Sequence, residues 1–298
     1  MYLAKMLITM VLSASLLGVV QAADGPAANW QDEGVYLGEL TWPQAEEMLA
    51  NAPIVILPFA GGAKEHGRHL PMNADAKLME HLTDFAISKR NVVVAPPVLY
   101  GWFPAFREFP STEIEDPAVF QRFMFLAAKS LVASGAQRVL FLNTGITRAT
   151  GLPIAIAARE IRAQCGIATL VISWDDLETE EVEAFTQQPW GGHADETETS
   201  VNLALQPDLV RMSEAAEDLG SPPKDYPGYR PGKLPRSSAD GEPRAGIRGD
   251  PTLASAEKGR KTLAVMEKNW LAALDGFAAD PKILSTGQCG DSRPLRER

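Results

Sequence analysis

Short apolar runs alternate along this chain with longer segments of helical periodicity, and this alternation limits the folds that the chain can adopt. Four runs rich in β-branched residues end in Pro, Asn or Ser, at residues 54–57, 92–94, 139–142 and 170–172. Runs without polar alternation are typical of central strands in a parallel sheet that helices cover on both sides. The segments between them predict helices over residues 76–88, 117–134 and 152–164. This series predicts an α/β fold with a mostly parallel central sheet.

The N-terminal segment predicts a secretory signal peptide. Lys5 precedes an apolar run over residues 6–20, which is too short to cross about 30 Å of hydrocarbon. Small residues at Val20 and Ala22 then indicate cleavage before Ala23. The alternative is a buried N-terminal helix. We therefore predict a signal peptide over residues 1–22 and a periplasmic or secreted protein, with no membrane association after cleavage.

The rest of the chain is predicted to form one domain over residues 23–280. Residues 219–250 interrupt the pattern with many prolines and few apolar residues, which predicts a long surface loop. Asp250 and Pro251 then begin a long helix, and residues 281–298 are predicted to form a flexible tail. The net charge of −10 argues against a nucleic-acid partner or an anionic membrane surface.

The two cysteines, Cys165 and Cys289, leave two alternatives open. An oxidising compartment would allow a disulfide that ties the C-terminal tail to the body of the protein. Two separate thiols fit the sequence equally well.

Histidines and carboxylates gather in two loops. In open parallel sheets, ligands bind beyond the carboxyl ends of the strands. The loop after the first run carries His66 and His69 among acidic and basic residues, and a later glycine-rich loop carries His193. Imidazole with carboxylate suits zinc, iron or manganese. We interpret His81 as a structural residue of a helix, and the following acids as a solvated helix face: Glu178, Glu180, Glu181 and Glu183.

Three ordered motifs extend over most of the chain. The first is H-G-R-H-L-P at 66–71 with Asp75, the second is G-H-A-D-E-T-E-T-S at 192–200, and the third is G-D-P-T-L-A-S-A-E-K-G at 249–259. In order and spacing this set resembles the creatininase family of metal-dependent amidohydrolases.

The resemblance implies a three-layer α/β/α sandwich, often assembled as a hexamer, so a homo-oligomer is expected. It also implies a dinuclear metal centre that hydrolyses amide C–N bonds. By position, His66, Asp75 and Glu198 match metal ligands, with Asp75 bridging the two ions. His193 matches the histidine that assists proton transfer, and Glu196 is a weaker match beside it.

Two ligand positions depart from the family pattern. Lys64 stands where the family has its first glutamate, and Gly145 stands where it has a histidine ligand. We therefore expect one ion, most simply zinc but with manganese or iron as alternatives, held by His66, Asp75 and Glu198. Lys64 would take the place of the first ion and compensate the charge of Asp75. Alternatively, the loop slips by one residue and Glu65 restores a ligand.

Two functions follow from these departures. The first is hydrolysis of an amide in a small molecule. The alternative is a catalytically inactive periplasmic protein that binds a small anionic ligand through Lys64, Arg68 and Arg148. In that case three aromatic residues would form a pocket wall, although packing is the simpler interpretation of each: Trp102, Phe103 and Trp190.

Overall fold

The computed structural model describes residues 32–146, 151–219, 246–280 and Cys289. Its centre is a five-stranded parallel sheet with the strand order β1-β3-β2-β4-β5. The strands are β1 (Val35–Tyr36), β2 (Ile54–Phe59), β3 (Val92–Val94), β4 (Arg138–Asn143) and β5 (Ala168–Ser173). The four predicted strands are confirmed, and the two-residue edge strand β1 was not predicted.

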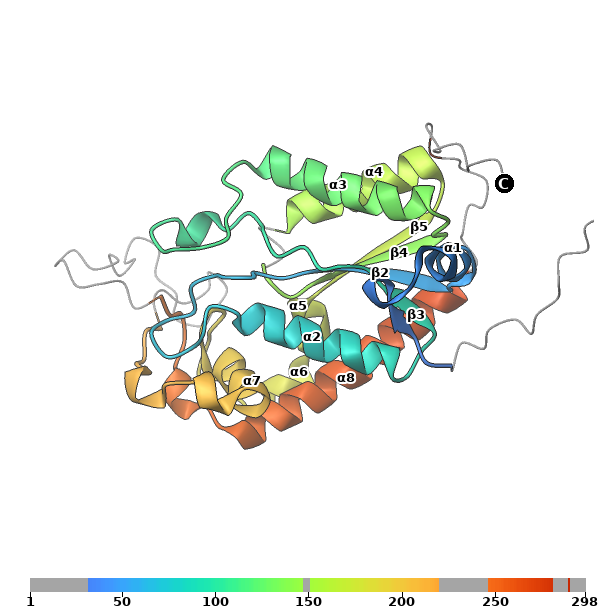
Figure 1. The fold of residues 1–298 in the computed structure, drawn as a ribbon. Coiled ribbons are helices and arrows are strands. Elements are labelled where there is room, and N and C mark those ends of the chain that lie inside the picture. The colour runs from blue at the N-terminus through green and yellow to red at the C-terminus, as the bar shows by residue number, and fades with distance from the viewer. Residues whose placement is uncertain (1–31, 147–150, 220–245, 281–288, 290–298) are drawn as a thin grey trace, which may run out of the picture.

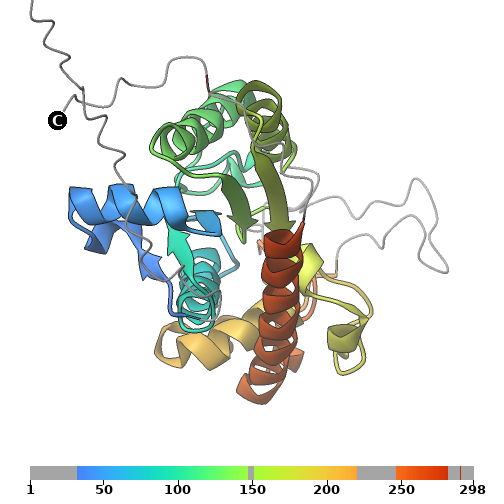
Figure 2. The same cartoon turned by 90° about the vertical axis from the view of Figure 1, so that its right-hand side faces the viewer.

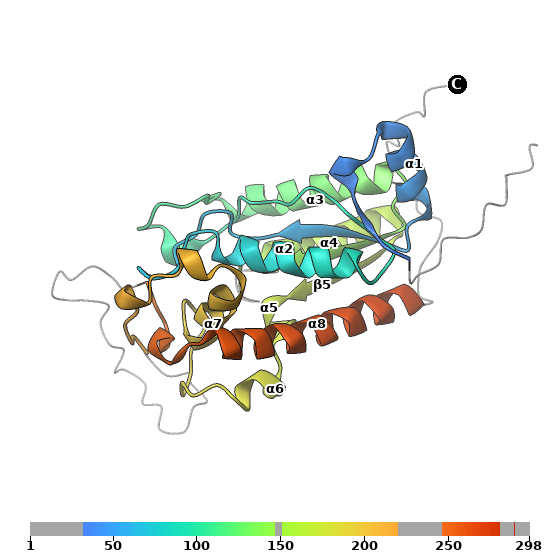
Figure 3. The same ribbon diagram turned by 60° about the horizontal axis from the view of Figure 1, so that its bottom comes forward.

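Helices cover both faces of the sheet, which confirms the predicted three-layer arrangement (Figures 1 and 2). One face carries α3 (Pro117–Ala133) and α4 (Leu152–Cys165), and the other carries α2 (Ala74–Ile87) and α8 (Ala256–Ala279). Figure 3 shows α8 running along the lower layer beside α2 and α7. The remaining α-helices are α1 (Trp42–Asn51), α5 (Trp174–Leu177), α6 (Glu180–Glu183) and α7 (Glu196–Leu205). Short 3-10 helices lie at Leu37–Glu39, Pro104–Phe106, Pro207–Leu209, Met212–Glu214 and Pro251–Leu253.

The two helical layers each enclose a core against the sheet. Along β2, Val55 and Leu57 belong to the cluster under α3 and α4, whereas Ile54 and Ile56 belong to the cluster over α2 and α8. Successive side chains of a strand point to opposite faces, so a strand covered on both sides must be apolar at every position. This burial explains why β2 is a continuous apolar run.

The helix starts follow their capping residues. Asp116 accepts a hydrogen bond from the backbone N–H of Ala118 and precedes Pro117, as expected for the start of α3. The predicted helix at Pro251 begins with a single 3-10 turn, and α8 starts only at Ala256. The reason is a second cap, because the Ser255 side chain accepts a hydrogen bond from the N–H of Lys258.

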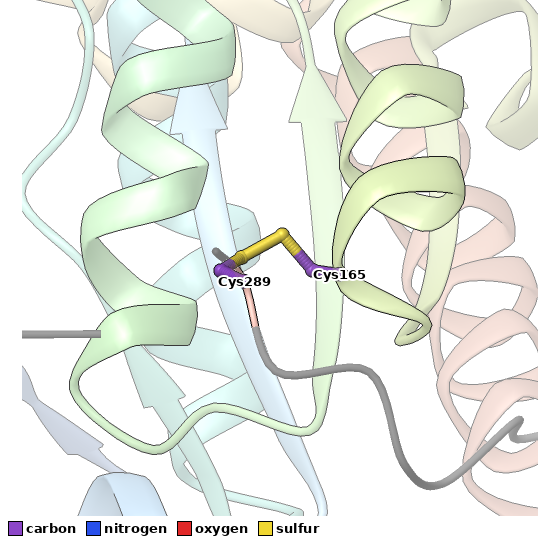
Figure 4. Close-up of a disulfide and its surroundings, with 2 residues drawn as sticks. All are labelled: Cys165 and Cys289. Atoms are coloured by element: carbon purple, nitrogen blue, oxygen red, sulfur yellow. A yellow bond between two sulfur atoms is a disulfide. The ribbon is translucent and has the colours of Figure 1, made fainter. Parts of the chain in front are cut away.

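Cys165 and Cys289 form a disulfide that joins the end of α4 to a residue 124 positions later (Figure 4). This pairing decides between the two alternatives left by the sequence. The predicted signal peptide and most of the predicted loop and tail lie outside the described residues. None of the described helices is both long and apolar enough to span a lipid bilayer.

Candidate metal centre

The first half of the site lies in the loop that follows β2. The loop returns to the sheet at α2, and Asp75 lies in the first turn of that helix. The side chains of Lys64, Glu65, His66 and Asp75 are all buried. Four ionisable groups are thus held at the carboxyl edge of the sheet, where parallel α/β folds place their ligands.

Lys64 occupies the position between Asp75 and Gly145. Its Nζ lies 2.8 Å from Asp75 Oδ2 and donates a hydrogen bond of 2.8 Å to the Gly145 carbonyl. A Cβ at Gly145 would lie 2.4 Å from the backbone nitrogen of Gly61, so the loop conformation leaves no room for a side chain there. The two departures from the family pattern therefore meet in space, because the Lys64 ammonium contacts the Gly145 carbonyl.

His66 is fixed by hydrogen bonds at both ring nitrogens. Nδ1 lies 2.9 Å from the Lys64 carbonyl oxygen, and Nε2 lies 2.9 Å from Asp75 Oδ1. Burial alone would lower the pKa of His66, but the Asp75 carboxylate overcomes it and raises that pKa. Burial would likewise raise the pKa of Asp75, but Lys64 and His66 lower it below its ordinary value. Asp75 is thus an ionised carboxylate between two partners.

The second half of the site is the start of α7. Asp195 caps this helix by accepting hydrogen bonds from the N–H groups of Thr197 and Glu198. Ala194 before it has a φ of 48°, in the left-handed region, and its N–H donates to the Glu198 carboxylate. The turn therefore directs Glu198 back toward His193, with 3.8 Å between its Oε2 and His193 Nδ1.

Glu65 and His193 join the two halves. Glu65 Oε2 lies 3.0 Å from His193 Nε2, and the N–H of Gly67 donates to the same carboxylate. Gly246 makes room for this carboxylate, since a Cβ there would lie 1.7 Å from Glu65 Oε1. The Phe106 ring packs 4.2 Å from the His193 ring, centroid to centroid. The imidazole is thus held by a carboxylate at its edge and by an aromatic ring.

Three side chains converge closely enough to share an ion. Ligand atoms of His66, His193 and Glu198 all lie within 4.8 Å of one another. The ring centroids of His66 and His193 are 5.0 Å apart. Two imidazoles and a carboxylate form the donor set of several catalytic zinc sites. The residues present therefore fit a divalent metal ion.

Comparison with known proteins agrees with this geometry. A family model described as Creatinine amidohydrolase matches residues 38–274. The chain belongs to the creatininase family. It is 28% identical over 249 residues to the Creatinine amidohydrolase of Pseudomonas putida, an alignment that covers 78% of this chain and 93% of the relative. It is also 27% identical over 237 residues to the Mycofactocin precursor peptide peptidase of Mycolicibacterium smegmatis, covering 77% of this chain and 86% of the relative.

Solved creatininase structures share the fold. A Zn-Zn type creatininase variant superposes with a TM-score of 0.67 at 26% identity, covering 84% of this chain and all of that chain. A manganese form gives a TM-score of 0.64 at 26% identity, covering 83% of this chain and all of that chain. The family assignment makes the chain a metal-dependent hydrolase of amide C–N bonds, as predicted. The alternative of an inactive binding protein finds no support in these relatives.

Within this creatininase-family site, Glu196 and His69 contact neighbouring residues of the fold. Glu196 accepts hydrogen bonds from the backbone N–H groups of Gln187 and Gln188 and pairs with Lys258, so it braces the loop before α7. His69 is buried against the Thr199 hydroxyl at 2.8 Å, and burial lowers its pKa to about 4.

The prediction of a solvated acidic face is wrong for Glu178. Glu178 is predicted to lie on a solvated face, but it is only partly exposed, and its carboxylate accepts a hydrogen bond from Trp174 Nε1. Burial raises the pKa of Glu178 to about 7, and the nearby Asp195 and Glu198 charges act in the same direction. The other three acids of that group are exposed, as predicted.

The aromatic residues considered for a pocket wall pack elsewhere. Phe103 is buried in the core under α3, and Trp102 packs against the same cluster. Trp190 donates a hydrogen bond to the Leu219 carbonyl. Arg68 is exposed, and Arg148 lies outside the described residues. The aromatic ring beside the candidate ligands is instead that of Phe106, which the sequence did not indicate.

Proposed function

We propose that this protein hydrolyses an amide C–N bond in a small molecule with one divalent ion per chain. The named activity of its relatives and a creatininase structure complexed with creatine support a small amide as the substrate class. Zinc and manganese are the metals named for similar structures, and zinc is the simpler choice for a site built of imidazole and carboxylate.

The observation that carries the single-ion proposal is the position of the Lys64 ammonium. It lies 2.8 Å from both Asp75 Oδ2 and the Gly145 carbonyl oxygen, at the two positions where the family resemblance implies ligands of the first ion. A buried ammonium there supplies positive charge to Asp75 without a metal ion. A second cation beside it would be repelled at short range in a poorly solvated site.

His66 and Glu198 are the ligands common to every version of this proposal. Asp75, implied by the resemblance, and His193, favoured by the geometry, compete for the third position. A bound divalent ion would lower the pKa of a water molecule toward about 7 and polarise the scissile carbonyl. The Lys64 carbonyl holds Nδ1 of His66, so Nε2, which lies beside Asp75, is the nitrogen that would bind the ion.

The proposed location is the periplasm or the extracellular space. The predicted signal peptide supports it, and so does the disulfide, because disulfides persist mainly in oxidising compartments. A homo-oligomer is proposed from the family resemblance alone.

The test combines metal analysis with an amidase assay. Purified protein is dialysed against zinc or manganese, and bound metal is measured with and without chelation, alongside turnover of creatinine and a panel of small cyclic and linear amides. The proposal expects about one equivalent of metal and turnover that a chelator abolishes and metal restores. Protein that takes up no metal under any loading condition would overturn it.

A further inference from the structure

We propose that His193, and not Asp75, is the third metal ligand of this chain, and that Glu65 is the residue that positions it. This inference rests on the proposed function, because it concerns the ion that the function requires. It assigns His193 a role different from the proton transfer that the family resemblance implies, and it assigns a role to Glu65, which matches no family ligand.

The orientation of the His193 ring is the first argument. Nε2 is engaged by Glu65 at 3.0 Å, whereas Nδ1 is directed toward Glu198, with 3.8 Å between Nδ1 and Oε2. Histidine ligands commonly bind a metal through one nitrogen while a carboxylate holds the other, which fixes the tautomer and the ring orientation. Glu65 and His193 already have that arrangement.

The placement of Glu65 is the second argument. Its carboxylate is buried, accepts the N–H of Gly67, and fits only because Gly246 has no side chain. A carboxylate held from two sides can hold an imidazole in turn. The family has its glutamate at the position of Lys64, where it binds metal. In this chain the glutamate is one residue later, at Glu65, and it contacts the imidazole of His193 instead.

The engagement of Asp75 is the third argument. Its Oδ2 lies 2.8 Å from the buried Lys64 Nζ. A divalent ion bound to Asp75 would lie close to the buried Lys64 ammonium, and the two positive charges would repel each other. Among the described residues, the set of donors that lie within 4.8 Å of one another contains His193 and omits Asp75.

The assignment has a chemical consequence. A nitrogen that binds a metal ion carries no proton, and the other ring nitrogen is held by Glu65. His193 cannot then also deliver a proton to the leaving group, so the two roles exclude each other.

X-ray absorption at the zinc edge tests the assignment on the unmodified protein. Full-length mature protein loaded with one equivalent of zinc should show two imidazole ligands, those of His66 and His193. A spectrum with one imidazole would overturn this inference while leaving the proposed function standing. Failure of the protein to bind any zinc would instead overturn the proposed function itself.

Variants give an independent measurement through zinc retention. His193→Ala should lose zinc on gel filtration, whereas His81→Ala, which removes a histidine paired with Glu267 outside the site, should retain it. The double variant Lys64→Met/Asp75→Asn removes both buried charges together and should still retain one equivalent. Its loss of zinc, with a native circular dichroism spectrum, would overturn the inference in favour of Asp75.

Glu65→Gln tests the positioning role. Loss of the carboxylate behind a metal-binding histidine typically weakens metal affinity by about 10- to 100-fold. We expect that loss in a competition assay against a chromogenic chelator, at an unchanged melting temperature of the metal-free protein. Unchanged zinc affinity would overturn the role of Glu65.

Discussion

Replacing Lys64 by Met removes the cation that compensates a buried carboxylate. The side chains of Lys64 and Asp75 are almost fully buried and lie 2.8 Å apart. Removing one partner of a buried ion pair typically costs about 3–5 kcal/mol, because the other charge stays buried without compensation. For a domain of this size roughly 2 °C of melting temperature corresponds to 1 kcal/mol, so we expect metal-free Lys64→Met to melt about 6–10 °C lower.

The matched control is Lys77→Met, on the exposed surface of α2. Lys77 also contacts an acid, Glu80 at 3.1 Å, but both side chains are solvated, and such pairs contribute at most about 1 kcal/mol. The double variant Lys64→Met/Asp75→Asn should be more stable than Lys64→Met, because no buried charge is left alone. Melting curves of chelator-treated protein measure all three. If Lys64→Met melts at the same temperature as Lys77→Met, the Lys64 ammonium does not stabilise the buried Asp75 carboxylate.

The pH dependence of this stabilisation has a definite sign. Lys64 and His66 hold the pKa of Asp75 below its ordinary value, against the opposing effect of burial. The stabilisation from the ionised carboxylate is therefore present at neutral pH and is lost as pH falls through that lowered pKa.

Three further predictions concern other parts of the molecule. Reduction of the Cys165–Cys289 disulfide, or its replacement by two alanines, should lower the free energy of unfolding in urea by about 2–5 kcal/mol. An unchanged urea midpoint would mean that the disulfide does not stabilise the fold. Gly259→Ala should destabilise the protein by at least about 1–3 kcal/mol, because its Cβ would lie 1.8 Å from a backbone oxygen of α7. Gly276→Ala, on the exposed side of α8, should be neutral or stabilising. Equal melting temperatures of the two variants would refute the close packing of α7 against α8. Burial raises the pKa of Glu178 to about 7, so the folded state holds its proton longer than the unfolded state and stability should fall as pH rises from about 4.5 to 7. Glu178→Gln should reduce that fall, and identical pH profiles of the two proteins would contradict the burial argument.

The sheet could be predicted from sequence because its strands are buried on both faces. A run such as 54–57 has no polar position, and only a central strand in a covered sheet explains that pattern in so short a segment. The edge strand β1 has two residues and carries no comparable signal. The Cys165–Cys289 pairing could not be predicted, because sequence separation does not give spatial distance.

The candidate site could be predicted only in part. The motifs indicated His66, Asp75 and Glu198, and the replacement at Lys64 correctly suggested a cation beside Asp75. The contact between Glu65 and His193 joins residues 128 positions apart, through two loops that meet only in the folded chain. No periodicity or spacing in the sequence encodes that meeting.

Anomalous diffraction at the zinc edge, from crystals grown with excess zinc, is the most direct measurement of how many ions this site accepts. A single-ion site predicts one peak beside His66 and Glu198, with the Lys64 ammonium still between Asp75 and the Gly145 carbonyl. Two peaks in each chain, or a peak between Asp75 and Gly145 with the lysine displaced, would contradict it.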